Sequence, residues 1–317
     1  RTSRRQRQMC IRDRSLGEGE FGTEIMNTVY GEIPYDRLDL WRRFCNYYYN
    51  CLRDVDRHMM KLIHSLEDTG QIDNTIIFMI SDHGEMLGQQ GARGKIVSWE
   101  ESIRVPTLVY HPDLKDKKLC NSVISNIDIV PTLLEFTGLS KSELRNKYPE
   151  LKGNSYAELV ENVDYYNIRD KEGHLIHGVQ IIPTVFEVAE KFRHTALADG
   201  FLAKTKAFMS EGKFLPDFTP PLNYKGIVDK KHKFLRFFSP RQNNIPTNYD
   251  ELTKYNAEYQ LYDLENDPFE MNDLAKDENN RKLLMSMNDK CNRLADKEIG
   301  LENHVIHLPG PDWFWTA

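Results

Sequence analysis

One short stretch of the chain, SDHGEMLGQQGARGK at residues 81–95, brings an acid, an imidazole and a lysine close together in the sequence. Asp82 offers carboxylate oxygens and His83 offers a ring nitrogen, and both are ligand types that suit a divalent cation. Lys95 adds an ammonium group. A cation and a lysine on one anionic ester would neutralise its non-bridging oxygens as charge moves to the leaving group. The stretch therefore indicates sulfuryl or phosphoryl transfer.

The surroundings of these residues favour a site. They follow the apolar run 76–80, which is typical of a buried strand, and ligands in open α/β sheets bind beyond the carboxyl ends of strands. Adjacent strand residues point to opposite faces, so Asp82 and His83 reach one cation only if the backbone turns, which Gly84 permits. Without that context, a turn cap, a buried histidine and a surface lysine would explain the same three residues.

The elements around this stretch predict an α/β region. Apolar residues at steps of three or four predict a helix over 38–69, which ends near Gly70. Strands are expected at 76–80, at 105–110 and near 122–125. A helix is expected over 128–139, with Asp128 as its cap, Pro131 in its first turn and Gly138 at its end. We assign residues 15–140 to this catalytic α/β domain.

Residues 141–317 have a different pattern and predict a C-terminal subdomain. A loop leads into a helix at 151–160, and 182–209 is mainly helical in pattern. Three antiparallel strands are expected within 224–238 and 258–265, and a helix over 278–299 should pack on that small sheet. The region is therefore expected to be α+β.

Composition excludes several classes of protein. The 317 residues include 28% charged residues and carry a net charge of −6, and no apolar run is long enough to cross a membrane. Residues 1–14, with six arginines and one aspartate, are interpreted as a non-native basic head, so nucleic-acid binding is not expected. The five irregularly spaced cysteines predict neither a disulfide framework nor a zinc site. They leave a cytoplasmic and a periplasmic location open.

Four segments in order resemble the C-terminal half of a sulfatase of the alkaline phosphatase superfamily. They are DNTIIFMISDHGEMLGQQGARGK, SWEESIRVPTLVYHP, SNIDIVPTLLEFTGL and YQLYDLENDPFEMNDLA, within roughly residues 38–296. The resemblance implies an alkaline-phosphatase-like sandwich with a mostly parallel sheet, incomplete here, plus the C-terminal subdomain. It implies that Asp82 and His83 bind the catalytic cation, most commonly Ca²⁺ with Mn²⁺ or Zn²⁺ as alternatives. Lys95 would contact the sulfate, and Glu101 and Arg104 would form a structural turn.

The sequence departs from the family at the nucleophile. Sulfatases carry CxPSR or SxPSR, whose first residue becomes formylglycine, and neither pattern occurs here; Ser239-Pro240-Arg241 lacks the context. We therefore expect an N-terminally truncated chain, inactive alone, from an enzyme that hydrolyses a small-molecule or saccharide sulfate ester.

Other interpretations stay open. One is a phosphodiesterase or phosphonate monoester hydrolase of the same superfamily, in which His174 and His177 could bind a second metal. Another is a sulfatase-like binding protein without catalysis. The aromatic tail 310–317 leaves a homo-oligomer as a further expectation.

Overall fold

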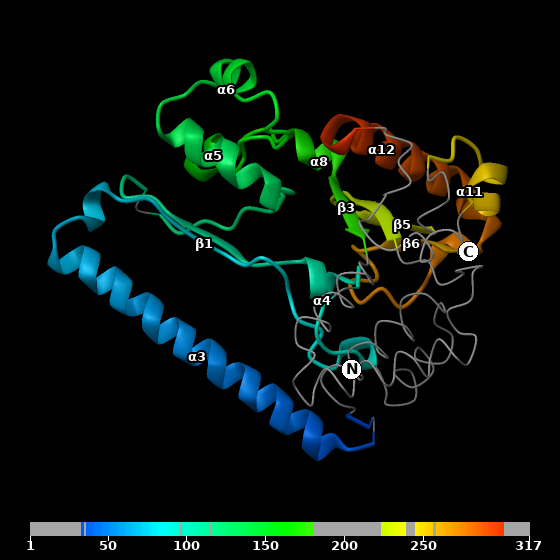
Figure 1. The fold of residues 1–317 in the computed structure, drawn as a ribbon, viewed down its shortest axis with the longest axis horizontal. Coiled ribbons are helices and arrows are strands. Elements are labelled where there is room, and N and C mark those ends of the chain that lie inside the picture. The colour runs from blue at the N-terminus through cyan, green and yellow to red at the C-terminus, as the bar shows by residue number, and fades with distance from the viewer. Residues whose placement is uncertain are drawn as a thin grey trace, which may run out of the picture. The chain divides into compact units, whose positions relative to one another are not determined.

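The computed structural model describes residues 33–34, 36–95, 97–114, 116–179, 223–238, 245–255 and 258–300 (Figure 1). They form two compact units. The described part of the N-terminal unit comprises residues 33–34, 36–95, 100–114 and 116–170, and that of the C-terminal unit comprises 97–99 and the described residues from 171 to 300. The predicted helix at 182–209, Ser239-Pro240-Arg241 and the aromatic tail lie outside the described residues. The predicted domain boundaries at residues 14 and 140 stay predictions.

Helix α3, Leu38–Asp68, confirms the predicted long helix. Thr69 closes its last turn by donating from its backbone amide to the Ser65 carbonyl, and Gly70 follows with a φ of +67°, a conformation that favours glycine. None of the helix residues is fully buried. No helix among the described residues is both long and apolar enough to cross a membrane.

Strands β1, Ile77–Ile80, and β2, Thr107–Tyr110, confirm two predicted strands. They pair antiparallel, with Ile77 opposite Tyr110 and Ile80 opposite Thr107. Every strand pair within the described residues is antiparallel, so the predicted mostly parallel sheet is not seen among them. The strand expected near 122–125 is wrong: these residues form a loop. The Asp170 carboxylate accepts from the Val123 amide at 2.7 Å and the Asn167 side chain donates to the Val123 carbonyl, so side chains bind the backbone groups a strand would pair.

Helical segments complete the N-terminal unit and lead out of it. The helix predicted over 128–139 is present as α5, preceded by the 3₁₀ turn η4, and Gly138 follows it with a φ of +96°. The bounds are 3₁₀ turn η2 Ile72–Asn74, η3 Gln89–Gly91, α4 Glu100–Ile103, η4 Asn126–Asp128, α5 Ile129–Phe136, α6 Lys141–Lys147, α7 Ala157–Glu161 and α8 Ile168–Glu172.

The prediction that Asp128 caps α5 with its side chain is wrong, because its carboxylate accepts no hydrogen bond from the first turn of that helix. The carboxylate is buried and forms a bidentate ion pair with Arg169, whose Nη2 donates to Oδ1 at 2.6 Å and whose Nε donates to Oδ2; both side chains are 1% exposed. The same carboxylate accepts from the amides of Ser125 and Asn154. Because a buried carboxylate needs several donors, Asp128 binds four groups from three segments instead of the helix end.

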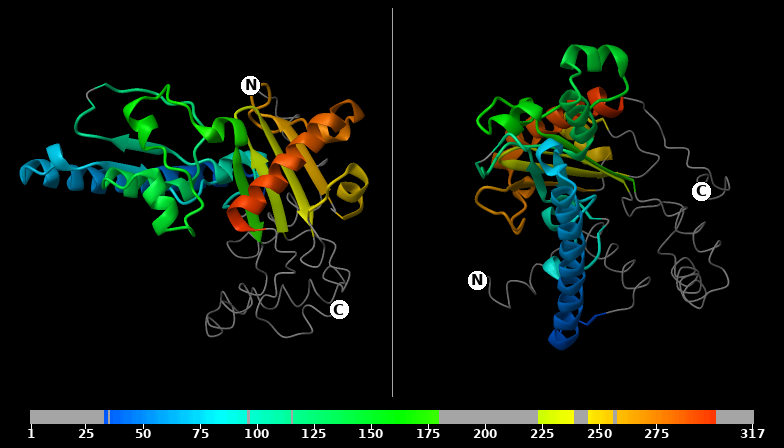
Figure 2. Two further views of the ribbon diagram at one scale, coloured as in Figure 1. Left: turned by 90° about the horizontal axis from the view of Figure 1, so that it is seen from above. Right: turned by 90° about the vertical axis from the view of Figure 1, so that its left-hand side faces the viewer.

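The C-terminal unit contains a four-stranded antiparallel sheet in the order β3-β4-β5-β6. Three strands were predicted; β3 was missed because its histidines and glycine obscure the strand pattern. Helix α12 lies across one face (Figure 2), as predicted, and the core between them includes Ile227, Phe234, Leu261, Leu284, Met287 and Cys291. The bounds are β3 His174–Val179, β4 Asn223–Val228, β5 His232–Phe238, β6 Glu258–Asp263, α11 Tyr249–Tyr255 and α12 Arg281–Ile299, with 3₁₀ turns η5 Leu274–Lys276 and η6 Glu278–Asn280.

The acidic segment after β6 forms turns. Asp263 accepts from the amides of the next turn, and Asp273 accepts from the amides of Leu261 and Ala275. Glu270 differs, because its buried carboxylate lies 2.5 Å from the ammonium of Lys233, which is 0% exposed. This pair fixes the turn against the centre of the sheet.

Asp128→Asn should lower the free energy of unfolding by about 3–5 kcal/mol, because it leaves the Arg169 guanidinium buried without its counter-charge and keeps an acceptor for only one of the two amides. Urea denaturation measures this. Glu278→Gln, in an exposed pair with Arg281, is the control and should change it by about 1 kcal/mol or less. Equal effects of the two substitutions would contradict the role of the buried pair.

Candidate functional site

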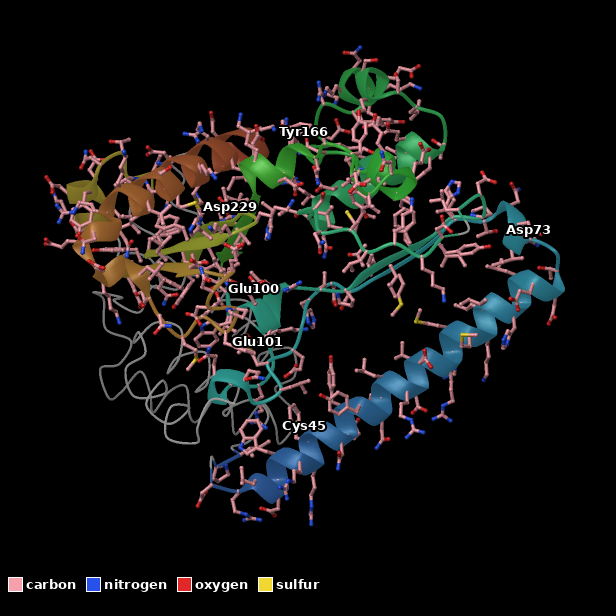
Figure 3. All side chains as sticks on the ribbon, turned by 180° about the vertical axis from the view of Figure 1, so that it is seen from behind. Cys45, Asp73, Glu100, Glu101, Tyr166 and Asp229 are labelled. Carbon is pink, nitrogen blue, oxygen red and sulfur yellow. The ribbon has the colours of Figure 1, made fainter. Side chains whose placement is uncertain are left out.

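The turn after β1 is fixed by Gly84. Its amide donates to the Ser102 carbonyl at 2.8 Å, and a Cβ atom there would lie 2.0 Å from the Glu101 carbonyl oxygen. Only glycine fits so close to the backbone of α4, whose residues Glu100 and Glu101 are labelled in Figure 3. Glu101 thus has a structural role, through its main chain.

The three predicted site residues come together beside this turn. The carboxylate Oδ2 of Asp82 lies 3.4 Å from Nε2 of His83, and the His83 amide donates to Asp82 Oδ1 at 3.0 Å. The ammonium of Lys95 hydrogen-bonds to Nε2 of His83. An acid, an imidazole and an ammonium group therefore form one small cluster.

The hydrogen bonds of His83 determine which ring nitrogen is free to accept. Nδ1 lies 2.8 Å from the Gly84 carbonyl, which can only accept, so Nδ1 carries the proton and Nε2 presents its lone pair. A metal-binding histidine commonly donates its other ring N–H to a carbonyl in this way. Asp82 and His83 therefore fit two positions of a cation shell. Within the described residues, no group of three or more His, Cys, Asp or Glu side chains could hold a metal.

Asp82 is mostly exposed and its pKa lies below the usual value for an aspartate. Partial desolvation raises this pKa, but hydrogen bonds from the backbone amides of His83 and Asp82 and the charge of the Lys95 ammonium act in the opposite direction, and the pKa is lowered. The carboxylate is therefore ionised at neutral pH, as cation binding requires.

The glycine-rich loop is closed by Glu85, which the sequence analysis missed. Its Oε1 accepts from the amide of Gly94 at 2.5 Å, and the Met86 amide donates to the Gly94 carbonyl at 2.9 Å. Gly94 has a φ of +75°. The signal available in the sequence was a single acid at the start of a loop whose backbone amides need an acceptor. These bonds hold Lys95 close to His83.

The N-terminal half of α3 supports the same loop. The ring of Trp41 packs so closely on Gly88 that a Cβ atom there would lie 3.1 Å from it. Sγ of Cys45, which is labelled in Figure 3, lies 3.8 Å from the Leu87 carbonyl. Burial and the charge of Glu85 raise the pKa of Tyr48. The long helix therefore holds one side of the candidate site.

His174 and His177 do not form the second metal site considered above. Both lie on β3, three residues apart, so their side chains point to opposite faces of the sheet. Two ligands of one cation would have to share a face.

Comparison with known proteins identifies relatives of this chain. Residues 3–139 match the family model described as Sulfatase. An arylsulfatase from Clostridium perfringens is 33% identical over 118 residues, which cover 36% of this chain and 23% of that protein. A choline-sulfatase from Rhizobium meliloti is 34% identical over 123 residues, which cover 39% of this chain and 23% of that protein.

Solved structures share the fold. A protein in complex with its substrate D-glucosamine-2-N,6-O-disulfate has a TM-score of 0.53 at 20% identity, covering 80% of this chain and 41% of that one. A phosphonate monoester hydrolase from Silicibacter pomeroyi has a TM-score of 0.61 at 17% identity, covering 97% of this chain and 51% of that one. The chain thus spans about half the length of these structures.

Gly84→Ala should displace the cluster, because the added Cβ meets backbone that cannot rotate away. We expect large shifts of the amide NMR signals of His83 and Lys95 and a loss of roughly 1–3 kcal/mol in unfolding free energy. Gly70→Ala is the control, since nothing lies within 4 Å of its Cβ position and only its φ of +67° is strained. That control should leave the two signals in place, and unshifted signals in Gly84→Ala would refute the constraint.

Proposed function

Because residues 3–139 are related to the sulfatases of the alkaline phosphatase superfamily, we propose that the whole protein hydrolyses sulfate esters. The observation that carries this proposal is the cluster of Asp82, His83 and Lys95, which combines a half-shell for a cation with a fixed ammonium group. The sulfated sugar bound by one structural relative and the names of the sequence relatives support a small-molecule or saccharide sulfate ester.

Each residue has a separate role in this proposal. Asp82 and His83 would hold a divalent cation, with Ca²⁺ preferred over Mn²⁺ or Zn²⁺, and that cation supplies Lewis-acid stabilisation of the sulfuryl oxygens. Lys95 donates to the ester and stabilises charge on the leaving oxygen. Gly84 and Glu85 position these groups through the turn and the closed loop. The formylglycine nucleophile, the remaining ligands and a mostly parallel sheet would come from other parts of the whole protein.

The alternative is hydrolysis of phosphonate monoesters or phosphodiesters, and a phosphonate monoester hydrolase is among the structural relatives. The same groups neutralise either anion, so this observation favours it as the second candidate. A binding protein without a nucleophile is the third.

Lys95→Met in the whole protein should lower kcat for 4-nitrophenyl sulfate by roughly 10²–10³, because a donor to the developing charge is removed. KM should change less. Lys61→Met, on exposed α3, is the charge-matched control. If the wild type cleaves phenyl phosphonate esters but not 4-nitrophenyl sulfate, phosphonate ester hydrolysis is favoured. If it cleaves neither substrate, a binding protein without catalysis is favoured.

Lys95→Met should also tighten binding of Ca²⁺ or Mn²⁺, measured by calorimetry in the absence of substrate. The ammonium occupies the same Nε2 lone pair as a metal and repels it. Removing a unit charge about 4 Å from a divalent cation is worth roughly 2 kcal/mol in water, or about thirtyfold in affinity. Asp82→Asn should weaken binding. Unchanged affinity in both variants would place the cation elsewhere.

A further inference from the structure

Three basic residues and a tyrosine form one row across the sheet of the C-terminal unit, beneath α12. The core row Leu175, Ile227, Phe234 and Leu261 runs across all four strands. Two residues further along each strand, the next row on the same face is His177, Lys225, Arg236 and Tyr259. A helix-covered sheet face would ordinarily be apolar there.

The burial of this row increases from the edge strand inward. His177 on β3 is exposed, Lys225 on β4 is 8% exposed and Arg236 on β5 is 0% exposed. Arg236 donates from Nη1 to Asn288 on α12 at 2.6 Å, while its Nε and Nη2 have no hydrogen-bond partner among the residues that the structure describes. Nε and Nη2 form one edge of the guanidinium, the edge that binds two oxygens of an oxyanion at once.

Three described acids of this unit pair with cations other than Lys225 and Arg236. Asp229 pairs with Lys290 at 2.7 Å, Glu270 with Lys233 at 2.5 Å, and Glu172 with Lys297 at 3.2 Å. Cys291 faces Lys225 and Arg236 from α12, but burial raises the pKa of its thiol despite these two charges, so it adds no negative charge. Burying a guanidinium without a counter-charge is costly.

We propose that His177, Lys225 and Arg236 form a binding site for a tetrahedral oxyanion, a sulfate or phosphate group, reached from the β3 edge. The open edge of Arg236 would bind two oxygens and Lys225 a third. His177 lies at the entrance. This site uses none of the residues of the Asp82 cluster, so its test does not depend on whether the protein hydrolyses sulfate esters.

Calorimetric titration of the chain with sodium sulfate and with phosphate, at constant ionic strength set by chloride, tests the site. Saturable binding is expected in the wild type. Lys225→Met and Arg236→Lys should each weaken it at least tenfold. The second substitution keeps the positive charge but removes the guanidinium edge that binds two oxygens. Lys276→Met, an exposed lysine of the same unit, should bind like the wild type. If glucosamine 6-sulfate binds more tightly than sulfate, the ligand is a sulfate group carried on a sugar. If it binds more weakly, the ligand is the free ion.

Proton uptake provides a second readout. Burial and the charge of Arg236 lower the pKa of Lys225 to about 8, against a small opposing effect of Cys291, and His177 and the Phe238 ring also face this lysine. An anion raises that pKa, so titrations at pH 8 in two buffers of different ionisation enthalpy should show proton uptake that Lys225→Met abolishes. Lys225→Met removes a buried charge and should fold. Absence of saturable binding, or wild-type affinity in this variant, overturns the proposal.

Discussion

The contact between Gly84 and the backbone of α4 determines where the chain leaves β1, and the candidate site depends on it. Asp82 and His83 precede this turn, while Lys95 returns eleven residues after it. Since the Gly84 amide is bound to the Ser102 carbonyl at 2.8 Å, the strand end cannot slide along its partner without losing that bond. The imidazole therefore meets both the carboxylate and the ammonium because the backbone between them is fixed at one point and closed at another by Glu85.

The buried pair of Asp128 and Arg169 supports the same strand end from the other side. It holds the turn at Asn126–Asp128, and the Asn126 side chain donates to the Ser81 carbonyl at 3.2 Å. Breaking the pair would therefore affect Ser81 through one intermediate residue. A buried ion pair contributes little net stability compared with an apolar pair, but it accepts only one arrangement of its donors. Here the pair fixes the position of the Asn126–Asp128 turn, and through Asn126 that of Ser81.

Much of this arrangement could be predicted from residue patterns, and the failures share a cause. The helix at Leu38–Asp68, the strand at Ile77–Ile80 and helix α12 follow from apolar periodicity, which reports local packing. The types and spacing of Asp82, His83 and Lys95 in the sequence were enough to predict a site for an anionic ester. The missed features, Asp128 bound to Arg169 and Glu85 bound to Gly94, are polar contacts 41 and 9 residues apart. A single sequence does not show which distant donor a carboxylate will meet. It likewise does not show whether two strands pair parallel or antiparallel, because the two strands can be far apart in the chain.

Charge compensation distinguishes the two basic environments of the C-terminal sheet. Lys233 and Arg236 lie on the same strand and both are fully buried, yet Lys233 meets the carboxylate of Glu270 at 2.5 Å. They are three residues apart and so face opposite sides of the sheet. The side away from α12 is closed by the turn that carries Glu270. On the α12 side, an amide oxygen from Asn288 satisfies one Arg236 nitrogen but supplies no charge. Within the described residues, β5 therefore pairs one buried cation, Lys233, with a carboxylate, and leaves the charge of the other, Arg236, without a carboxylate partner.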